Sequence, residues 1–295
     1  MSNSTTPAVD RPIFLLGSGR SGTTPLYHLM SVHPELCWFS NVSNRLPWLP
    51  FAPLVHRLVD VGAFGRSMKQ HILQRRGGKK RLAPVEAELI YDRAGFRHDC
   101  RTTEDDYDPV VDEKIHRAVA NHVRYSGKPR FISKQTANNQ RYRLLNRLFP
   151  DALFVHLIRD GRAVANSIRG QGWLDVMDLW WMEDKATNHI DEYDDPIELC
   201  GKHWQTNLDE LLAGKELLGD RYLELRYEDM IKDVHGCVRQ VLDFCALSAP
   251  EGYFELLPKD LPNMNNKWQA DLNKDQIEGL HRVIGERLQQ LGYPV

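Results

Sequence analysis

The most constraining feature of the chain is a short apolar run that leads into a glycine-rich loop near the N-terminus. Residues 13–16 are four consecutive apolar residues, which predict a short buried strand. The loop at residues 17–22 contains three glycines and two serines, and apolar residues at helical spacing follow it. Pro25 suits the first turn of such a helix, where no backbone N–H is needed. A strand, a glycine-rich loop and a helix N-terminus form a site for an anion, because free N–H groups and the helix dipole point toward it.

Two known phosphate-binding motifs nearly fit this loop. The three glycines have the spacing of the dinucleotide-binding fingerprint, but residues 37–41 lack the acid expected about 20 positions later. The loop also fits the Walker A motif, except that Thr23 replaces the lysine that binds the outer phosphates. Arg20 is the only cation of the loop. The sequence therefore predicts a phosphate site, with a tight strand-to-helix turn without a ligand as the structural alternative.

A second apolar run, at residues 154–158, also enters a charged turn and then a helix. Arg159 follows the run directly, and Ser167 lies eight residues later on the second turn of the predicted helix. Ligands of open parallel sheets bind at the carboxyl ends of the strands. We therefore expect both side chains to converge on a second anion beside the first loop. The alternative is an ion pair between Arg159 and Asp160 at the helix start, with Arg162 in solvent.

Together the two segments resemble the signature of sulfotransferases that use 3′-phosphoadenosine 5′-phosphosulfate (PAPS). The resemblance implies that the first loop holds the 5′-phosphosulfate and that Arg159 and Ser167 hold the 3′-phosphate. An arginine in the first loop resembles the protein-tyrosine and bacterial branches of the family. The cofactor-binding residues implied in this loop are Ser18, Gly19, Arg20, Ser21, Gly22, Thr23 and Thr24.

Three further segments resemble the family in the same order along the chain, so that the likeness extends from residue 12 to about residue 270. Lys134 lies on a predicted strand and corresponds to a lysine near the sulfuryl group. Tyr227 corresponds to a tyrosine near the adenine. Lys267 and Trp268 correspond to a late segment that closes over the nucleotide.

Sulfuryl transfer requires that the leaving phosphate is neutralised, that the sulfuryl oxygens are held and that the acceptor loses a proton. We assign Arg20 and Lys134 to the leaving phosphate. The backbone amides of residues 21–24 and the hydroxyls of Thr23 and Thr24 are assigned to the sulfuryl oxygens. The resemblance implies no metal, and the sequence has no His or Cys cluster with zinc-like spacing.

The general base is the least determined assignment, because this chain departs from both family branches. The cytosolic branch has a histidine shortly after its lysine, but residues 135–138 contain none. The protein-tyrosine branch has a glutamate shortly after the first helix, but residues 39–41 contain none. We select Glu86 as the base, with His98 as the second candidate.

Glu86 is expected on a helix, on the same face as Ile90, with Glu88 well round the axis and in water. Partial burial would then raise the pKa of the Glu86 carboxyl and make it a better base near neutral pH. The alternative is that Glu86 forms an ion pair with the basic run at residues 75–81. This run itself is interpreted as a solvated loop, a lid over the cofactor, or a contact to an anionic acceptor or membrane surface.

Composition limits the partners and the compartment. The formal net charge is −2, which argues against bulk nucleic-acid binding. Five scattered cysteines without a CxxC pair predict buried thiols in a reduced, cytoplasmic protein. No run approaches the ~20 apolar residues of a membrane span, and residues 1–10 lack the pattern of a signal peptide. The acceptor stays open among lipid, sugar or glycan, phenol and peptide, and the oligomeric state is not predicted.

Short apolar strands that alternate with helices predict an α/β protein with a parallel sheet. With the resemblance, we expect a P-loop-NTPase-like three-layer fold that has a central parallel sheet and helices on both faces. Residues 1–11 are expected to be a disordered tail and residues 12–295 a single sulfotransferase domain. Helical or lid insertions, at about 42–128 and 170–220, are expected around the acceptor cleft.

Two stretches within these insertions contain apolar side chains at helical spacing. One helix is expected over residues 57–73. Trp173, Trp180 and Trp181 are placed in another helical stretch, where they belong either to the core or to the acceptor site.

Two other functions remain possible at this point. A P-loop-type kinase of small molecules is compatible with the near-Walker loop, although Thr23 argues against it. A non-catalytic protein that binds the nucleotide 3′,5′-bisphosphate would keep both anion sites without transferring a group to a hydroxyl or amine acceptor.

Overall fold

Five parallel strands form the sheet at the centre of the chain, whose computed structural model describes residues 9–74 and 82–295. Their order across the sheet is β2 (Leu36–Cys37), β3 (Arg130–Lys134), β1 (Ile13–Leu16), β4 (Leu153–Ile158) and β7 (Tyr222–Arg226). Every residue of β1, β3 and β4 is buried, as expected for a parallel sheet covered on both faces. The predicted α/β fold with a central parallel sheet is confirmed.

The register of the sheet brings the segments expected to bind phosphate to one edge. Leu15 of β1 lies beside Lys134 of β3, and Leu16 lies beside His156 of β4. The chain crosses from one side of β1 to the other at this point, since β3 and β4 flank it. Open α/β sheets bind ligands where the strand order reverses in this way.

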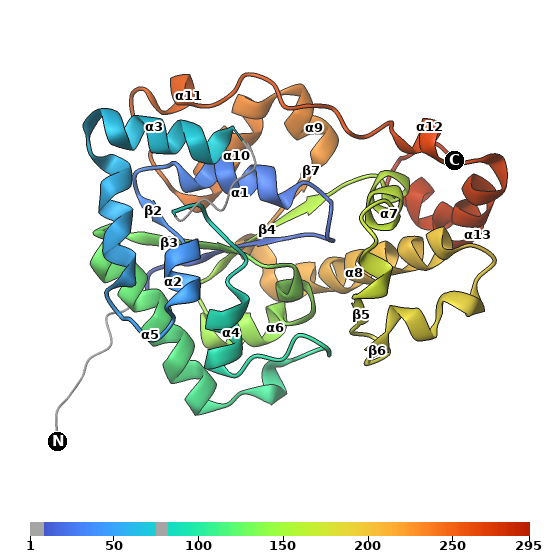
Figure 1. Ribbon diagram of the computed structural model, residues 1–295, viewed down its shortest axis with the longest axis horizontal. Helices are drawn as coiled ribbons and strands as arrows, with labels where there is room; N and C mark the ends of the chain where they lie inside the picture. Colours follow the sequence, from blue (N-terminus) through green and yellow to red (C-terminus); the bar gives the residue numbers. More distant parts are fainter. Residues whose placement is uncertain (1–8, 75–81) are drawn as a thin grey trace.

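Helices cover both faces of the sheet, and β1 shows how its side chains divide between them. Ile13 and Leu15 point to a core shared with α1 (Thr23–Ser31), α3 (Gly62–Leu73) and α10 (Val234–Cys245). Phe14 and Leu16 point to a second core shared with α4 (Glu88–Ala94), α5 (Pro109–Ser126) and α6 (Tyr142–Leu148). Figure 1 shows the first group above the sheet and the second group below it.

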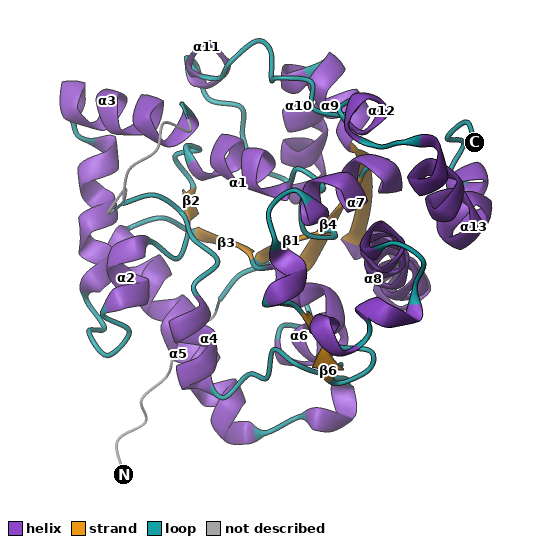
Figure 2. Cartoon of the chain, turned by 45° about the vertical axis from the view of Figure 1, so that its right-hand side comes forward, coloured by secondary structure: helices purple, strands orange, loops and turns teal. Residues whose placement is uncertain are grey.

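A third core lies beside the sheet, where α7 (Gly161–Arg169), α8 (Pro196–Leu218) and α13 (Lys274–Gln290) pack together. Figures 1 and 2 both show these helices on the opposite side of the molecule from α3. The remaining elements are α2 (Asn41–Arg45), η1 (Ala52–Asp60), η2 (Glu104–Asp106), η3 (Thr136–Gln140), η4 (Trp173–Asp175), β5 (Asp178–Leu179), β6 (Asp184–Lys185), η5 (Ala186–Asn188), η6 (Ile190–Glu192), η7 (Gly219–Arg221), α9 (Tyr227–Lys232), α11 (Tyr253–Leu256) and α12 (Trp268–Asp271).

Two predictions for the inserted segments are wrong in detail. The helix expected over residues 57–73 is two helices, η1 and α3, because Val61 is extended and Gly62 has a φ of 49°. The helical stretch expected around the tryptophans is instead a series of short turns with the antiparallel hairpin β5–β6. Left-handed backbone at Gly172 and Glu183, with φ of 65° and 53°, interrupts any longer helix there.

Residues at the end of the expected N-terminal tail contact the domain. Val9 packs against the second core, and the backbone N–H of Arg11 donates to Asp151 Oδ2 over 2.8 Å. Residues 9–11 are therefore held by the domain, and the prediction of disorder for them is wrong. Residues 1–8 and the basic run at residues 75–81 lie outside the described residues.

The described residues give two further findings, on the cysteines and on the helices. All five cysteines are buried free thiols, as the sequence predicts. Among residues 9–74 and 82–295, no helix combines the length and the apolar character needed to cross a bilayer.

Acid is expected to destabilise the fold through three buried histidines. Burial lowers the pKa of His156 to about 3 and the pKa values of His122 and His203 to about 4. The unfolded chain binds protons below the ordinary histidine pKa of about 6.5, whereas the folded chain does not, so stability falls as the pH falls. Between about pH 7.5 and about pH 5.5 each histidine removes about 1.4 kcal/mol of the free energy of unfolding. Thermal unfolding of the ligand-free protein at both pH values measures this loss, and an unchanged melting temperature would contradict it.

Candidate active site

The loop at residues 17–22 joins β1 to α1, where the sequence places it, and three residues have left-handed backbone. Gly17 and Gly22 have φ of 147° and 98°, and Arg20 has a φ of 70°. A Cβ atom at Gly22 would lie 2.5 Å from the ring of Tyr227, so the loop and this tyrosine are in close contact. A non-glycine residue in this conformation is strained, and such strain is concentrated at ligand sites.

Unpaired polar groups of this loop fit a phosphate. The first N–H groups of α1 have no acceptor within the helix. The side-chain hydroxyls of Ser18 and Ser21 are buried and have no hydrogen-bond partner among the described residues. A buried hydroxyl without a partner is costly unless a ligand satisfies it. The loop therefore offers unpaired donors to an anion.

A buried pair of asparagines fixes the start of the loop. The backbone N–H of Gly17 donates to Asn139 Oδ1 over 3.0 Å, and Asn139 Nδ2 donates to Gly17 O over 2.9 Å. The same Nδ2 also donates to Asn207 Oδ1 over 3.1 Å. The sequence analysis missed both asparagines, because they lie more than 100 residues from the loop along the chain.

The structure brings Arg20, Arg159 and Ser167 together at the edge of the sheet. Arg20 Nε donates to Ser167 Oγ over 2.9 Å, and an Arg159 guanidinium N–H donates to Arg20 O over 2.9 Å. The Arg159 guanidinium also lies over the Tyr227 ring, 4.3 Å from its centroid. The two predicted anion sites therefore adjoin, with Arg20 between them.

A late segment of the chain also contacts Arg159. The guanidinium donates to Met264 O and to Asn265 Oδ1, the latter over 3.1 Å. Burial lowers the pKa of Arg159 from its ordinary value, but an arginine remains charged near neutral pH. The segment that approaches the predicted 3′-phosphate site is thus at residues 264–265, slightly before the expected Lys267 and Trp268.

The other charged residues of this region have structural contacts. Arg162 is buried and forms a two-pronged ion pair with Asp160 over 2.9 and 3.0 Å, so the alternatives of an Arg159–Asp160 pair and a solvated Arg162 are wrong. Trp268 is buried, and its ring centroid lies 4.4 Å from the guanidinium carbon of Arg162. Lys267 is exposed. Trp268 therefore belongs to the third core, and it anchors the segment that precedes α12.

On the other side of the loop, Lys134 and Glu86 form an ion pair. The backbone N–H and the hydroxyl of Thr136 both donate to Glu86 Oε2 over 3.0 Å. Glu86 precedes α4, which begins at Glu88, so its expected position on a helix is wrong. The carboxylate is instead held by residues that lie 48 and 50 positions away.

The predicted rise in the pKa of Glu86 is also wrong. Burial by itself raises this pKa, but the charge of Lys134 and the hydrogen bonds from Lys134 and Thr136 outweigh it. The pKa of Glu86 therefore lies below its ordinary value, and the group is a carboxylate at neutral pH.

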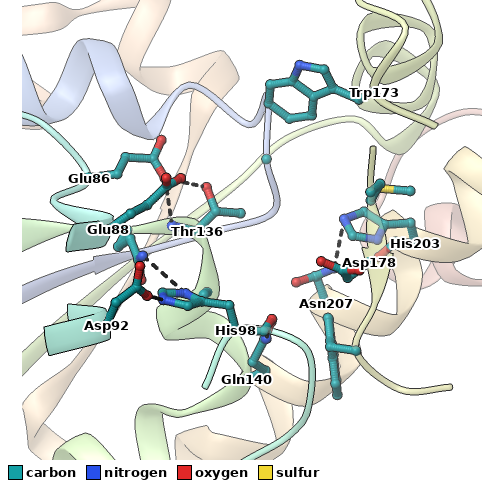
Figure 3. Close-up of a pocket in the computed structure, with 15 residues that line it drawn as sticks. Glu86, Glu88, Asp92, His98, Thr136, Gln140, Trp173, Asp178, His203 and Asn207 are labelled. Atoms are coloured by element: carbon teal, nitrogen blue, oxygen red, sulfur yellow. Dashed lines mark hydrogen bonds and ion pairs between the residues drawn. The ribbon is translucent and has the colours of Figure 1, made fainter. Parts of the chain in front are cut away.

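A cavity of about 520 Å³ opens between this carboxylate and α8. Figure 3 shows Glu86, Glu88, Asp92 and His98 on one side and Asp178, His203 and Asn207 on the other, with Trp173 above. His98 pairs with Asp92 through Nε2, and its Nδ1 lies 3.4 Å from Gln135 Nε2. Trp173, Met177 and Trp180 supply an apolar part of the lining, whereas Trp181 packs against His203 instead.

His203 is a cavity residue that the sequence analysis missed. It is buried, its Nε2 lies 3.2 Å from Asn207 Nδ2, and its Nδ1 has no partner among the described residues. Burial lowers its pKa to about 4, so the ring is neutral at neutral pH. The spacing of His203 and Asn207 by four residues on one helix was the available signal. Their position beside the cavity depends on how α8 packs.

The site combines the two predicted anion sites with a cavity lined by the Glu86 carboxylate and the neutral imidazole of His203. Within residues 9–74 and 82–295, no three His, Cys, Asp or Glu side chains are grouped so that they could hold a metal ion. The arrangement is that of a group-transfer site, in which a loop with unpaired donors borders a cavity for a second substrate.

The chain matches the sulfotransferase family over residues 12–251, and it therefore belongs to that family. This result confirms that the protein is a sulfotransferase, as the two phosphate motifs predict. It favours this function over a kinase and over a non-catalytic bisphosphate-binding protein.

Known relatives and solved structures are similar over almost the whole chain. The omega-hydroxy-beta-dihydromenaquinone-9 sulfotransferase Stf3 of Mycobacterium tuberculosis is 26% identical over an alignment of 318 positions, which covers 98% of this chain and 76% of the relative. Sulfotransferase STF9 from Mycobacterium avium has a TM-score of 0.63 at 17% identity, over 98% of this chain and 78% of that one. The sulfotransferase domain of the Synechococcus PCC 7002 olefin synthase has a TM-score of 0.53 at 17% identity, over 98% of both chains. These likenesses show the same fold.

Proposed function

We propose that this enzyme transfers the sulfuryl group of PAPS to a hydroxyl, or an amine, of a small-molecule acceptor. One observation carries the proposal: Arg20 joins the glycine loop to Arg159 and Ser167, and the loop borders the acceptor cavity at Gly19. A nucleotide with phosphates at both ends of its ribose matches two adjoining anion sites. PAPS is such a nucleotide, and it also supplies the sulfuryl group.

In this proposal the two ends of the nucleotide bind to different groups of residues. The backbone and hydroxyls of residues 18–24 hold the 5′-phosphosulfate, while Arg159 and Ser167 hold the 3′-phosphate with Arg20 between them. Tyr227 holds the adenine beside the Arg159 guanidinium. Lys267 reaches the nucleotide from the late segment, and Trp268 acts indirectly by anchoring that segment on the third core.

We assign the chemical step to Glu86 and Lys134. Glu86 takes the proton of the acceptor hydroxyl as the acceptor oxygen bonds to sulfur. The bond from sulfur to the phosphate oxygen breaks, and adenosine 3′,5′-bisphosphate leaves as an anion that Lys134 and Arg20 neutralise. His98 is the second candidate for the base, since it also lines the cavity.

The lining of the cavity favours an acceptor with an apolar body and one polar end. Trp173, Met177 and Trp180 offer apolar surface opposite the carboxylate, and His203 offers a neutral polar group. The Stf3 relative is named for a hydroxylated menaquinone, which has this character. We therefore place a hydroxylated lipid ahead of sugars and peptides. The buried free thiols support a cytoplasmic location.

Adenosine 3′,5′-bisphosphate is expected to stabilise the protein much more than 5′-AMP does, because only the bisphosphate has a 3′-phosphate. At 100 times its dissociation constant, a ligand adds about 2.7 kcal/mol to the free energy of unfolding. Arg159→Ala should weaken bisphosphate binding roughly 10- to 150-fold through the loss of charge-assisted hydrogen bonds. Thermal-shift titration and calorimetry with each nucleotide measure both effects.

Arg124→Ala provides the matched control, because Arg124 is exposed on α5 and distant from the loop. Its nucleotide affinity should equal that of the unsubstituted protein. Equal stabilisation by 5′-AMP and the bisphosphate would remove Arg159 and Ser167 from the proposed 3′-phosphate site.

A further inference from the structure

Six large apolar side chains between residues 48 and 64 point into solvent. We call this set the apolar ridge: Trp48, Phe51, Leu54, Leu58, Val61 and Phe64, which are 57%, 50%, 43%, 47%, 58% and 54% exposed. Leu54 and Leu58 lie four residues apart on η1, and Val61 and Phe64 continue the set across the break at Val61 and Gly62 into α3. An exposed set of this kind marks an interaction surface, whereas a single exposed apolar residue does not.

The ridge is the outward face of η1 and of the start of α3. Ala52, His56 and Val59 of the same helix are buried, so η1 packs on the protein through its other face. Figures 1 and 2 both show the chain between α2 and α3 along the outer edge of the molecule, far from α7 and α13. The catalytic cavity therefore does not account for these exposed side chains.

Positive charge lies beside the ridge. Trp48 also lines a second cavity of about 550 Å³, whose wall includes Arg93, Lys114 and Arg117 from α4 and α5. Glu113 pairs with Arg117 at this place. Arg57, between Leu54 and Leu58 in the sequence, is exposed and donates through Nε to Tyr125 O over 2.9 Å.

The acid on the ridge helix is already neutralised. Asp60 pairs with Lys69 over 2.9 Å and with Lys128 over 2.8 Å. The residues beside the ridge are therefore predominantly cationic, although the whole chain has a formal net charge of −2. An anionic partner with an apolar interior matches this distribution.

We propose that the apolar ridge docks the enzyme on an anionic phospholipid bilayer, with Arg93 and Lys114 binding lipid phosphates. Helices that lie in a membrane interface combine exposed Trp, Phe and Leu with Lys and Arg at the headgroup level. Trp48 lies at the boundary between the apolar and the cationic parts, where tryptophan is favoured in membrane interfaces. This surface goes beyond the proposed reaction, because none of its residues contacts the candidate active site.

The test is sedimentation of the whole 295-residue chain with phosphatidylcholine vesicles, with and without phosphatidylserine. We expect stronger binding to the anionic vesicles, and a decrease with salt. The variant Leu54→Ser/Leu58→Ser/Phe64→Ser should reduce the partition coefficient on the order of 10-fold or more. Arg93→Gln/Lys114→Gln should reduce it roughly five-fold for each charge removed, on anionic vesicles only.

Val176→Ser/Leu217→Ser is the matched control, since these two residues are 71% and 41% exposed but lie outside the ridge. This variant should bind vesicles like the unsubstituted protein. All variants should retain their melting temperature and their turnover of a water-soluble acceptor, which separates this proposal from the proposed function. Equal vesicle binding by the ridge variant and the control would overturn the proposal. An oligomer in solution that the ridge variant dissociates would also overturn it, and would assign the ridge to a second copy of the chain.

Discussion

Replacement of Glu86 by glutamine is expected to lower turnover about 10²-fold or more, the usual size of a general-base contribution. The affinity for adenosine 3′,5′-bisphosphate should not change, because Glu86 faces the acceptor cavity and not Arg159. Steady-state kinetics and bisphosphate calorimetry measure the two quantities separately. Glutamine keeps the size of the side chain and can still accept a hydrogen bond from Thr136, but it removes the ion pair with the buried Lys134. The melting temperature of the variant is therefore measured together with its turnover.

Glu88→Gln is the matched control for this variant. Glu88 lines the same cavity but is exposed at the start of α4, and its replacement should leave turnover nearly unchanged. Unchanged turnover in Glu86→Gln, with a collapse in His98→Ala or His203→Gln, would transfer the role of the base to that histidine.

The pH profile gives an independent test of the base. The pKa of Glu86 lies below its ordinary value in the folded protein, so the carboxylate persists as the pH falls. Activity should therefore persist to below the ordinary glutamate value of about 4.3, provided that the protein remains folded, whereas an imidazole base with an ordinary pKa loses activity near about pH 6.5. Burial lowers the pKa of His203 to about 4, so the His203→Gln variant, and not the pH profile, distinguishes that histidine from Glu86. A stability control is needed at each pH, because the buried histidines destabilise the fold in acid.

Lys134→Met is expected to lower turnover by roughly 10²- to 10³-fold, the effect typical of removing one group that stabilises developing negative charge. Lys134 should contribute more to the transition state than to bisphosphate binding, so the affinity should change less than turnover does. Loss of the neighbouring cation also raises the pKa of Glu86, because its charged form loses an attraction. The acid limb of the pH profile should therefore move to higher pH.

Lys215→Met is the matched control, because Lys215 is exposed and pairs with Glu224 over 3.5 Å, away from the cavity. A double variant, Lys134→Met/Glu86→Gln, should be less impaired than the sum of the single effects, since each residue acts partly through the other. Strict additivity, or an effect of Lys134→Met on affinity alone, would exclude the assigned catalytic role.

Local sequence determined the phosphate loop and the edge of the sheet where it lies. The loop needs only an apolar strand, glycines where φ is positive, and a helix start, all within residues 13–31. The positions of Arg159 and Ser167 were predictable for the same reason, since Arg159 follows the end of β4 and Ser167 lies on α7, the next helix. The parallel orientation of the strands was predictable from the alternation of short apolar runs with helices.

Tertiary structure decided the electrostatics of the acceptor side. The sequence could identify Glu86, but its pKa depends on Lys134 and Thr136, which a different strand brings to it. Burial alone raises a carboxyl pKa, and the nearby cation and hydrogen-bond donors determine whether that effect prevails. The roles of His203 and Asn139 could not be predicted from the sequence for the same reason. Their roles come from contacts between α8, η3 and the glycine loop, and residues so distant along the chain meet only when the sheet and its helices pack.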